Sequence, residues 1–353
     1  MPLESLLINM GINGSHKGKI TVGLIGLGDI SDIHIKTYLK RSDVVINALS
    51  DINHGLLSRK GKELGVDRLY PDYNYMFSDP NIDVIDVMTP HFLHKECVVN
   101  SLKCGKNVIC EKPIATNVAD IDAMVDASKK YKKDVYVKQY LRYSKAFIKA
   151  KEIIDSGKIG RPYFADCVYT SHAVNDFIEN KSWKGNVLES GGGVFISNGI
   201  HFVDLMHHFF GSVSGCGGNF KNVENATKGK GEDFANVHLE FKNGVSTNIV
   251  CTENDIGYRF RWELKIYGTK GIIHVFDDRK FTKTLNLIVE GKIVYKFIED
   301  SWWDNSNIYA IDDAVDRIKN KLSPFVSLGE AREILAVVLK SYEAGKFGKF
   351  IKL

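Results

Sequence analysis

Apolar and polar positions follow different patterns in the two halves of the chain. In the first half, short apolar runs alternate with segments in which apolar residues recur every three or four positions. Such runs are typical of strands buried on both faces, and the periodic segments are typical of amphipathic helices. The pattern predicts strands at 19–25, 44–50, 83–88, 108–110 and 134–137, and helices at 33–39, 55–65, 93–104 and 117–131. This alternation predicts a parallel sheet with right-handed crossovers, an α/β domain ending near residue 140.

The second half predicts a different sheet. After a helix at 144–156, a strand at 163–169 and a helix opened by residues 190–193, the chain from residue 212 is rich in strands. Turn signals such as Lys242-Asn243-Gly244 and residues 268–271 separate them, which favours a mostly antiparallel sheet. The expected strands are 234–241, 245–252, 260–267, 272–276, 285–289 and 293–297, and the expected closing helices are 307–320 and 329–344.

Three further segments complete the expected organisation. Residues 70–76 are expected to be a connecting segment, residues 301–304 an aromatic loop, and the last apolar residues a return to the sheet edge. The expected domains are a loose extension at 1–18, a nucleotide-binding domain at 19–140 and a substrate-binding and oligomerisation domain at 141–353.

Composition narrows the class of protein. The 353 residues are too many for one ordinary core, which favours two domains. A net charge of +4 is too small to predict nucleic-acid binding, and no apolar run is long enough for a membrane span. Six cysteines form no CxxC pair, which favours reduced, buried thiols in a cytoplasmic protein.

A glycine-rich loop follows the first strand. Gly26 and Gly28 stand in a GxGxxS pattern in which Gly26 permits a tight turn and Gly28 permits close approach of a pyrophosphate. The second strand ends in Asp51, where a carboxylate can bind ribose hydroxyls and repel a 2′-phosphate, so NAD is favoured over NADP. The alternative for Asp51 is a turn or capping acid. The predicted cofactor-binding residues of this edge are Gly26, Gly28, Asp29, Ile30 and Asp51.

Charged and polar residues also follow the later strands. Thr89-Pro90-His91 ends the strand at 83–88, and His94 falls in the first turn of the next helix. The strand at 108–110 runs into Glu111-Lys112-Pro113, and the proline biases Lys112 toward extended backbone. Ligands of doubly wound sheets bind at the carboxyl ends of the strands, so Lys112 can reach a cofactor and its substrate.

Taken in order, these motifs resemble the glucose–fructose oxidoreductase / inositol dehydrogenase (Gfo/Idh/MocA) family. The resemblance covers nearly the whole chain, from the glycine loop and Asp51 through Thr89-Pro90, His94 and Glu111-Lys112-Pro113 to a downstream glycine–histidine block. It implies an N-terminal Rossmann domain, a C-terminal α/β domain whose large sheet often forms oligomer interfaces, and tightly held NAD(P). It also implies sugars, polyols or sugar nucleotides as substrates.

The resemblance also assigns residues of the second half. Gln139 and Arg142 correspond to residues near the nicotinamide. Residues 182–185 resemble a loop that leads toward the substrate, in which Trp183 is expected to stack on a sugar and Lys184 to contact an anionic group. The alternative for residues 182–185 is an ordinary surface loop. His201 matches the catalytic histidine of a D-x-G-x-H-x-x-D pattern in which this chain has Ser197 for the first Asp and Asn198 beside it. One helical turn separates Ser197 from His201, so Ser197 is expected to orient His201 without making it much more basic.

These residues together predict an NAD-dependent dehydrogenase of a secondary alcohol on a sugar, polyol or sugar derivative. The substrate hydroxyl is expected between Lys112 and His201, with His201 as the base or, if Ser197 leaves it too weakly basic, Lys112. The alternatives are a nucleotide-sugar 3-dehydrogenase or ketoreductase and a non-catalytic NAD-binding sensor. No metal is expected, although His201 shares its helix with Asp204, His207 and His208. The expected partners are the small-molecule substrate and a second copy, giving a homodimer or homotetramer, and no nucleic acid or membrane.

Overall fold

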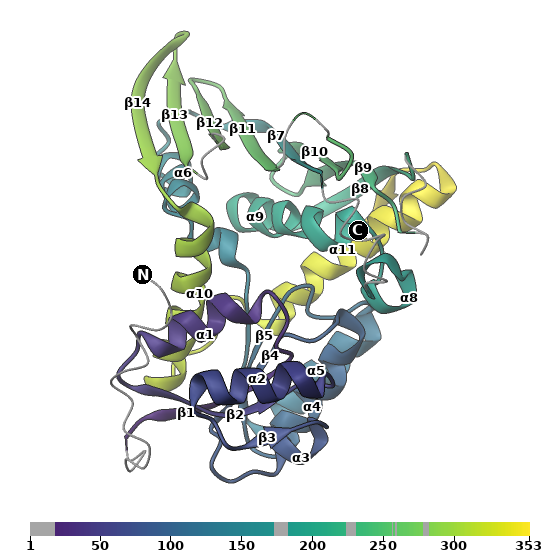
Figure 1. Ribbon diagram of the computed structural model, residues 1–353. Coiled ribbons are helices and arrows are strands. Elements are labelled where there is room, and N and C mark those ends of the chain that lie inside the picture. Colours follow the sequence, from purple (N-terminus) through teal and green to yellow (C-terminus); the bar gives the residue numbers. More distant parts are fainter. Residues whose placement is uncertain (1–17, 173–182, 224–230, 256, 258–259, 278–281) are drawn as a thin grey trace.

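The protein has two sheets with a layer of helices between them (Figure 1). The computed structural model describes residues 18–172, 183–223, 231–255, 257, 260–277 and 282–353, so the expected extension at the N-terminus lies almost wholly outside the described residues. The fold class is the predicted one: a parallel Rossmann sheet with helices, followed by a larger, mostly antiparallel sheet.

The first sheet has six parallel strands in the order β3-β2-β1-β4-β5-β6. This is the doubly wound order, in which the chain reverses direction next to β1 and leaves a binding crevice there. The expected connection at 70–76 contains two short elements that the pattern missed, β3 and α3. The strands are β1 (Ile20–Ile25), β2 (Val44–Ser50), β3 (Leu69–Tyr70), β4 (Val84–Val87), β5 (Asn107–Cys110) and β6 (Val135–Val137). The helices are α1 (Ser31–Leu39), α2 (His54–Leu64), α3 (Asn74–Phe77), α4 (His94–Lys103) and α5 (Val118–Tyr131).

The second sheet has nine strands in the order β14-β13-β12-β11-β7-β10-β9-β8-β15. Neighbouring strands are antiparallel except β7 and β10, because β7 enters the middle of the sheet from the first domain. The strands are β7 (Pro162–Ser171), β8 (Val213–Lys221), β9 (Phe234–Phe241), β10 (Ser246–Thr252), β11 (Phe260–Gly268), β12 (Ile272–Asp277), β13 (Lys283–Val289), β14 (Lys292–Glu299) and β15 (Ile351–Lys352).

Strand β8 was not among the predicted strands, because its glycine-rich sequence has low strand propensity. The glycines are needed for packing: a Cβ on Gly215 would lie 2.4 Å from the ring of Phe350, and one on Gly218 would lie 2.5 Å from the ring of Phe220. The predicted return of the last residues to the sheet edge is confirmed by the pairing of β15 with β8.

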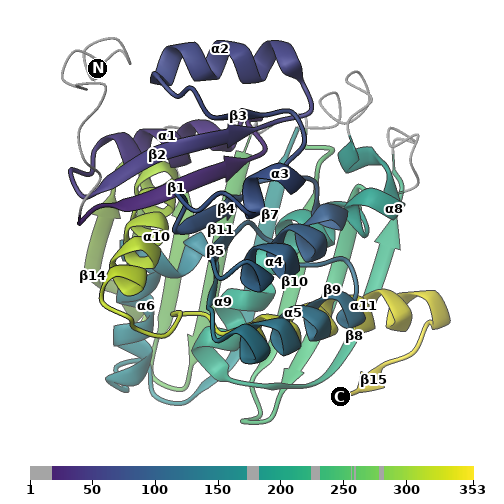
Figure 2. The same cartoon turned by 90° about the horizontal axis from the view of Figure 1, so that it is seen from below.

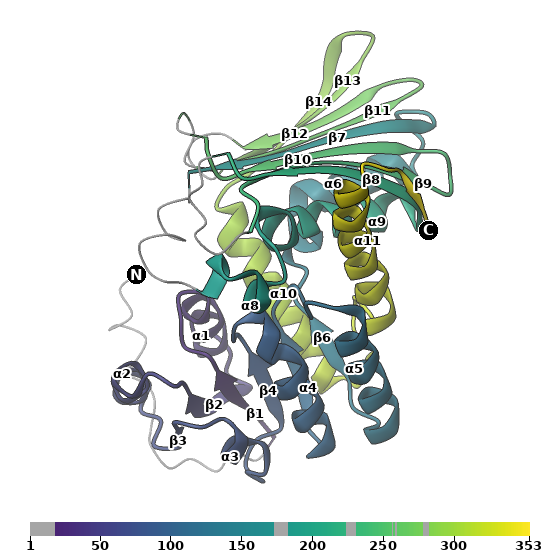
Figure 3. The same ribbon diagram turned by 90° about the vertical axis from the view of Figure 1, so that its right-hand side faces the viewer.

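Helices from the second half fill the space between the sheets (Figure 3). They are α6 (Lys145–Asp155), α9 (Ile200–Phe210), α10 (Trp302–Lys319) and α11 (Leu328–Phe347). The expected aromatic loop at 301–304 is wrong: Trp302 is fully buried in the first turn of α10. Helix α10 also packs on α1, and its Ile311 and Val315 join the core beneath the first sheet. The view in Figure 2 shows α10 beside α1, so the first domain draws part of its core from the end of the chain.

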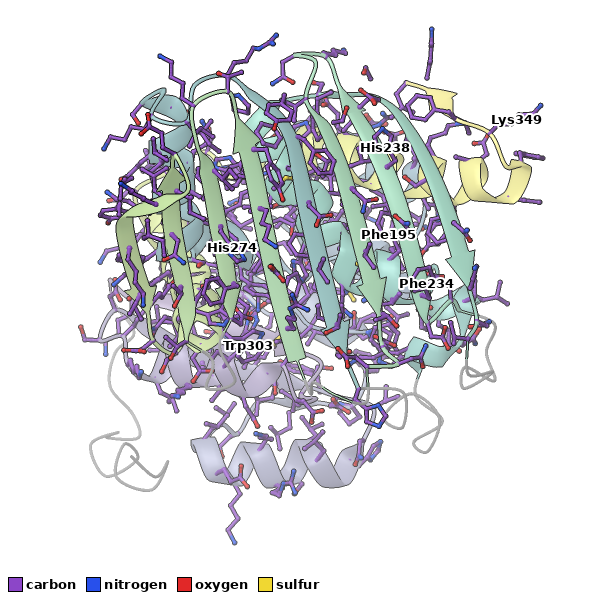
Figure 4. All side chains as sticks on the ribbon, turned by 90° about the horizontal axis from the view of Figure 1, so that it is seen from above. Phe195, Phe234, His238, His274, Trp303 and Lys349 are labelled. Carbon is purple, nitrogen blue, oxygen red and sulfur yellow. The ribbon has the colours of Figure 1, made fainter. Side chains whose placement is uncertain are left out.

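One face of the nine-stranded sheet packs on helices, and Figure 4 shows the other face, which no helix of the described residues covers. Polar pairs lie on it, such as His274 with Glu263 at 2.8 Å and His238 with Glu240 at 2.7 Å. All six cysteines are free thiols, and five are buried. No described helix is long and apolar enough to span a bilayer.

Candidate active site

The glycine loop takes the predicted form between β1 and α1. Gly26 has a φ of +89°, and a Cβ there would lie 2.7 Å from the carbonyl oxygen of Met88 at the end of β4. A Cβ on Gly28 would meet no protein atom within 4 Å. Gly26 is therefore required by the fold, whereas Gly28 leaves space that a ligand can occupy. A cavity of about 410 Å³ opens here, lined by Leu27, Gly28, Asp29, Asp32, Asn53, Gly55, Leu56, Arg59 and Lys60.

Asp51 ties the end of β2 to the glycine loop. Its Oδ2 accepts a hydrogen bond of 2.8 Å from the amide of Leu27, and its Oδ1 accepts one of 2.8 Å from the amide of Asn53. Each carboxylate oxygen retains a lone pair that can accept from a ribose hydroxyl. Asp51 therefore acts as the turn acid and remains suited to hold the adenosine ribose.

Two histidines brace the ends of β4 and β5. The ring nitrogens of His94, which begins α4 as predicted, lie 2.9 Å from the carbonyl oxygens of Thr89 and Pro113. His91 lies 2.9 Å from the carbonyl oxygen of Ser190 through Nδ1, and its ring meets Trp183 edge-on at 4.5 Å. Burial lowers the pKa of both rings. These contacts fix the loop that carries Thr89 and Pro90 against the loop after β5.

Lys112 leaves β5 toward the second domain. Its Nζ donates a hydrogen bond of 2.6 Å to the carbonyl oxygen of Ser197. Burial lowers the pKa of Lys112 to about 8; Glu111 opposes that shift, and the ammonium groups of Lys184 and Lys138 add to it. Although Glu111 is adjacent in sequence, no ion pair joins it to Lys112 among the described residues, and only the backbone amide of Lys112 contacts its carboxylate, at 3.3 Å. The structure thus presents a partly deprotonated amine at neutral pH.

The helix that carries His201 is interrupted by a π turn at Phe195–Gly199, directly before α9. The π turn alters the spacing on which the predicted contact between Ser197 and His201 depends. That contact is absent: Nδ1 of His201 has no hydrogen-bond partner in the described part of the chain. Ser197 contributes its carbonyl oxygen, which anchors Lys112.

His201 itself is fully buried among aromatic rings. Tyr140 meets its ring edge-on at 4.7 Å, and Trp262 meets it at 5.7 Å. Burial and the charge of Lys112 hold the pKa of His201 well below its ordinary value, with Glu111 acting weakly in the opposite sense. His201 is therefore neutral at physiological pH and a poor base, but it remains able to hydrogen-bond a hydroxyl.

Gln139 and Arg142 differ in how they fit their predicted roles. Gln139 is buried, and its Oε1 has no partner among the residues described, so it can accept from an amide such as a carboxamide. Arg142 binds Asp204 through two hydrogen bonds of 2.8 and 2.9 Å and Glu330 through one of 2.8 Å. Its guanidinium joins α9 to α11, so Arg142 has a structural role, and its expected role at the cofactor or substrate stays a prediction.

The remaining predicted substrate residues lie on two segments. Nδ2 of Asn198 donates a hydrogen bond of 3.3 Å to Glu253, which is buried at the end of β10. Trp183 packs on His91, and Lys184 is exposed and close enough to lower the pKa of Lys112. Residue 182, the first of the predicted loop, lies outside the described residues.

These residues fit a dinucleotide. The open space at Gly28 and the N-terminus of α1 suit a pyrophosphate, Asp51 suits the adenosine ribose, and the unpartnered Oε1 of Gln139 suits the carboxamide of a nicotinamide. Bound there, NAD supplies a hydride acceptor at the carboxyl edge of the parallel sheet, on which Lys112 stands.

Sequence reasoning missed a buried ionic cluster behind this edge. It consists of Asp86 in β4, His34 and Tyr38 in α1, Glu111 after β5 and Lys138 after β6. One signal was available: a charged residue inside the otherwise apolar strand 84–87 requires a buried partner.

Comparison with known proteins agrees with this geometry. Residues 20–139 match a family model described as an oxidoreductase family with an NAD-binding Rossmann fold, and residues 147–274 match the GFO/IDH/MocA C-terminal domain. The chain is 27% identical to the myo-inositol 2-dehydrogenase of Thermotoga maritima over 314 residues, which cover 87% of this chain and 90% of that protein.

Two solved structures show the same fold. A levoglucosan dehydrogenase in complex with NADH and levoglucosan superposes with a TM-score of 0.85 at 21% identity, covering 95% of this chain and 99% of that one. The WlbA dehydrogenase of Bordetella pertussis, in complex with NADH and UDP-GlcNAcA, superposes with a TM-score of 0.82 at 23% identity and covers 95% and 99%.

Proposed function

Because the chain belongs to the Gfo/Idh/MocA oxidoreductase family, we propose that it is an NAD-dependent dehydrogenase that oxidises a secondary alcohol of a sugar, a polyol or a sugar derivative. One observation carries the proposal. Nζ of Lys112, at the edge of the NAD-binding sheet, donates a hydrogen bond of 2.6 Å to the carbonyl oxygen of Ser197, directly before the helix of His201, and burial lowers the pKa of this amine to about 8. A lysine with this pKa can accept a proton at the pH at which most enzymes work.

Lys112 is the base in this proposal, and His201 holds the hydroxyl. The neutral amine of Lys112 takes the hydroxyl proton while the carbon loses its hydride. Ser197 anchors the amine through its carbonyl oxygen, at 2.6 Å. His201, whose pKa lies well below its ordinary value, stays neutral and positions the substrate oxygen. The pKa values and the missing partner of Nδ1 support this assignment over one in which His201 is the base.

The cofactor roles follow the loops. The phosphate-binding turn consists of Gly26, Gly28, Asp29 and Ile30, and Asp51 binds the ribose. The remaining proposed cofactor residues shape or line the sheet edge: Thr89, Pro90, His91, His94, Glu111 and Gln139. Trp183, Lys184 and Asn198 form the proposed substrate side. Trp183 packs on His91, Lys184 is close enough to Lys112 to lower its pKa, and Asn198 follows Ser197, whose carbonyl oxygen binds Lys112.

We also propose that the protein is a cytoplasmic homo-oligomer. Strand β14, at the edge of the nine-stranded sheet, carries exposed apolar side chains, among them Ile293, Val294 and Ile298, which are 59%, 58% and 52% exposed. Exposed apolar groups gathered on one element are typical of interaction surfaces. Free thiols throughout are typical of a reducing compartment.

The proposal is tested by NADH formation from NAD⁺ with two substrate panels, one of free sugars, inositols and other polyols and one of UDP- and dTDP-sugars. Turnover with the first panel and its loss in Lys112→Met support the proposal. Turnover with the second panel alone assigns the alternative, a nucleotide-sugar dehydrogenase. Confirmed NAD binding without turnover on either panel, in both reaction directions, refutes a dehydrogenase of these substrates and favours a sensor.

A further inference from the structure

The buried ionic cluster beside the active site has no role in the mechanism described so far. Oε1 of Glu111 lies 3.0 Å from Nε2 of His34 and forms a close ion pair with Nζ of Lys138, which itself lies 2.9 Å from Nε2 of His34. Nδ1 of His34 lies 2.6 Å from Oδ2 of Asp86, which also accepts a hydrogen bond of 2.6 Å from Tyr38. These side chains are almost completely buried.

Glu111 and Lys112 are adjacent, but their side chains serve different networks. Glu111 points into the cluster, toward α1 and the end of β6, whereas Lys112 points to the carbonyl oxygen of Ser197 before α9. A carboxylate paired only with Lys112 would stabilise its ammonium form, and an opposite charge within about 4–6 Å raises a lysine pKa by 1–3 units. A base at this position requires that the charge of Glu111 be compensated elsewhere.

We propose that Lys138, with His34, is a positioning residue that neutralises and holds Glu111, so that Lys112 is left with a free amine able to act as the base. In this proposal Lys138 and His34 act through Glu111. The groups that face Lys112 are Glu111 after β5, Lys138 after β6, His91 after β4, Lys184 in the 183–185 turn and His201 in α9. Within the cluster, Asp86 in β4 contacts His34 and Tyr38 of α1.

Electrostatics agrees with this arrangement. Burial favours the neutral acid of Glu111, but Lys138 and His34 outweigh it and hold the pKa of Glu111 well below its ordinary value. Burial lowers the pKa of His34, yet Asp86 and Glu111 overcome that effect and raise it. Glu111 is thus a permanent anion, and Lys138 is its closest cation.

The inference rests on the proposed role of Lys112, and its test needs no substrate. The pKa of Lys112 is measured from the pH dependence of its acetylation by a pulse of acetic anhydride, resolved by peptide mass spectrometry. In the wild type it should be about 8. In Lys138→Met it should rise by about one unit or more, so that labelling at pH 7 falls about tenfold. His34→Gln should cause a smaller rise. Lys340→Met removes an exposed charge paired with Glu343 and should change nothing.

A second set of variants keeps the test informative if Lys138→Met does not fold. Glu111→Gln should lower the pKa of Lys112, because the repulsion from Lys138 remains while the attraction is lost. Glu111→Gln/Lys138→Met removes both charges and should return it to within about half a unit of the wild-type value. An unchanged pKa in folded Lys138→Met, or in Glu111→Gln, overturns the inference. Absence of turnover on every panel overturns the proposed function alone, since the labelling is independent of substrate.

Discussion

The pH dependence of alcohol oxidation separates the two candidate bases. The pKa of Lys112 is about 8, so about one-tenth of the amine is neutral at pH 7 and about nine-tenths at pH 9. The rate at limiting substrate should therefore rise about tenfold between these values and then level off. His201 cannot produce this limb, because its pKa lies well below the ordinary value and its ring is already neutral.

The assay is the initial rate of NADH formation, as kcat/KM, from pH 6 to 10 with the substrate that the panels identify. Two variants show which residue causes the rise of the rate with pH. His201→Asn should lower the rate by about 10²- to 10³-fold, the effect of losing one positioned hydrogen bond to the reacting oxygen, while the midpoint stays near 8. Lys112→Met should remove turnover and leave NAD⁺ binding intact. A pH dependence of NAD⁺ binding alone would produce the same rise in rate, so the dissociation constant of NAD⁺ is measured over the same pH range.

One result would refute the reasoning: a midpoint between pH 6 and 7 that disappears in His201→Asn. In that case His201 is the base, and the burial of its ring does not decide its basicity once substrate and cofactor are bound. A rate that does not depend on pH would also contradict the assignment, since neither residue would then titrate in the reaction.

Three further predictions concern the scaffold. Gly26→Ala should abolish NAD⁺ binding and lower the melting temperature, because its Cβ would lie 2.7 Å from the carbonyl oxygen of Met88. Gly28→Ala should weaken NAD⁺ binding and leave the melting temperature unchanged, because its Cβ would meet no protein atom within 4 Å. Calorimetry measures both the binding and the melting temperature. Arg142→Met should lower the free energy of unfolding, measured by urea denaturation, by about 3–5 kcal/mol, because it removes the cation that pairs with the buried carboxylate of Asp204; unchanged stability would contradict its structural role. Lys112→Met should stabilise the apoprotein by about 2 kcal/mol below pH 8, since the lowered pKa disfavours the buried ammonium, and the gain should vanish as pH rises toward 10.5.

The first sheet could be predicted almost strand by strand, because each buried parallel strand is a short apolar run and each crossover is an amphipathic helix. The second sheet was predictable where hairpin turns mark it, as at Gly244. Strand β8 was not, because Gly215 packs against Phe350, which lies far away in sequence. Local propensity does not contain that information.

Residue type and order led to the prediction that Lys112 and His201 share one site, but they could not assign the roles of the two residues. The predicted role of Arg142 depended on position along the chain, and the structure shows its charge bound by Asp204 and Glu330. Periodicity cannot reveal such partners, because they come from α9 and α11. The same is true of Lys138, whose importance appears only when α1, β4 and β5 are brought together around it.

The π turn before α9 explains why the absence of an aspartate at position 197 need not abolish activity. In a regular helix, Ser197 would contribute through its side chain, and a hydroxyl is a weak substitute for a carboxylate. In this chain the backbone contributes instead: the carbonyl oxygen of Ser197 holds the amine of Lys112, and any residue at this position supplies that oxygen. If the proton is taken by Lys112, a carboxylate at position 197 would stabilise the ammonium form and weaken the base. Serine is then the side chain that suits a lysine base, and the departure from the family pattern is consistent with catalysis.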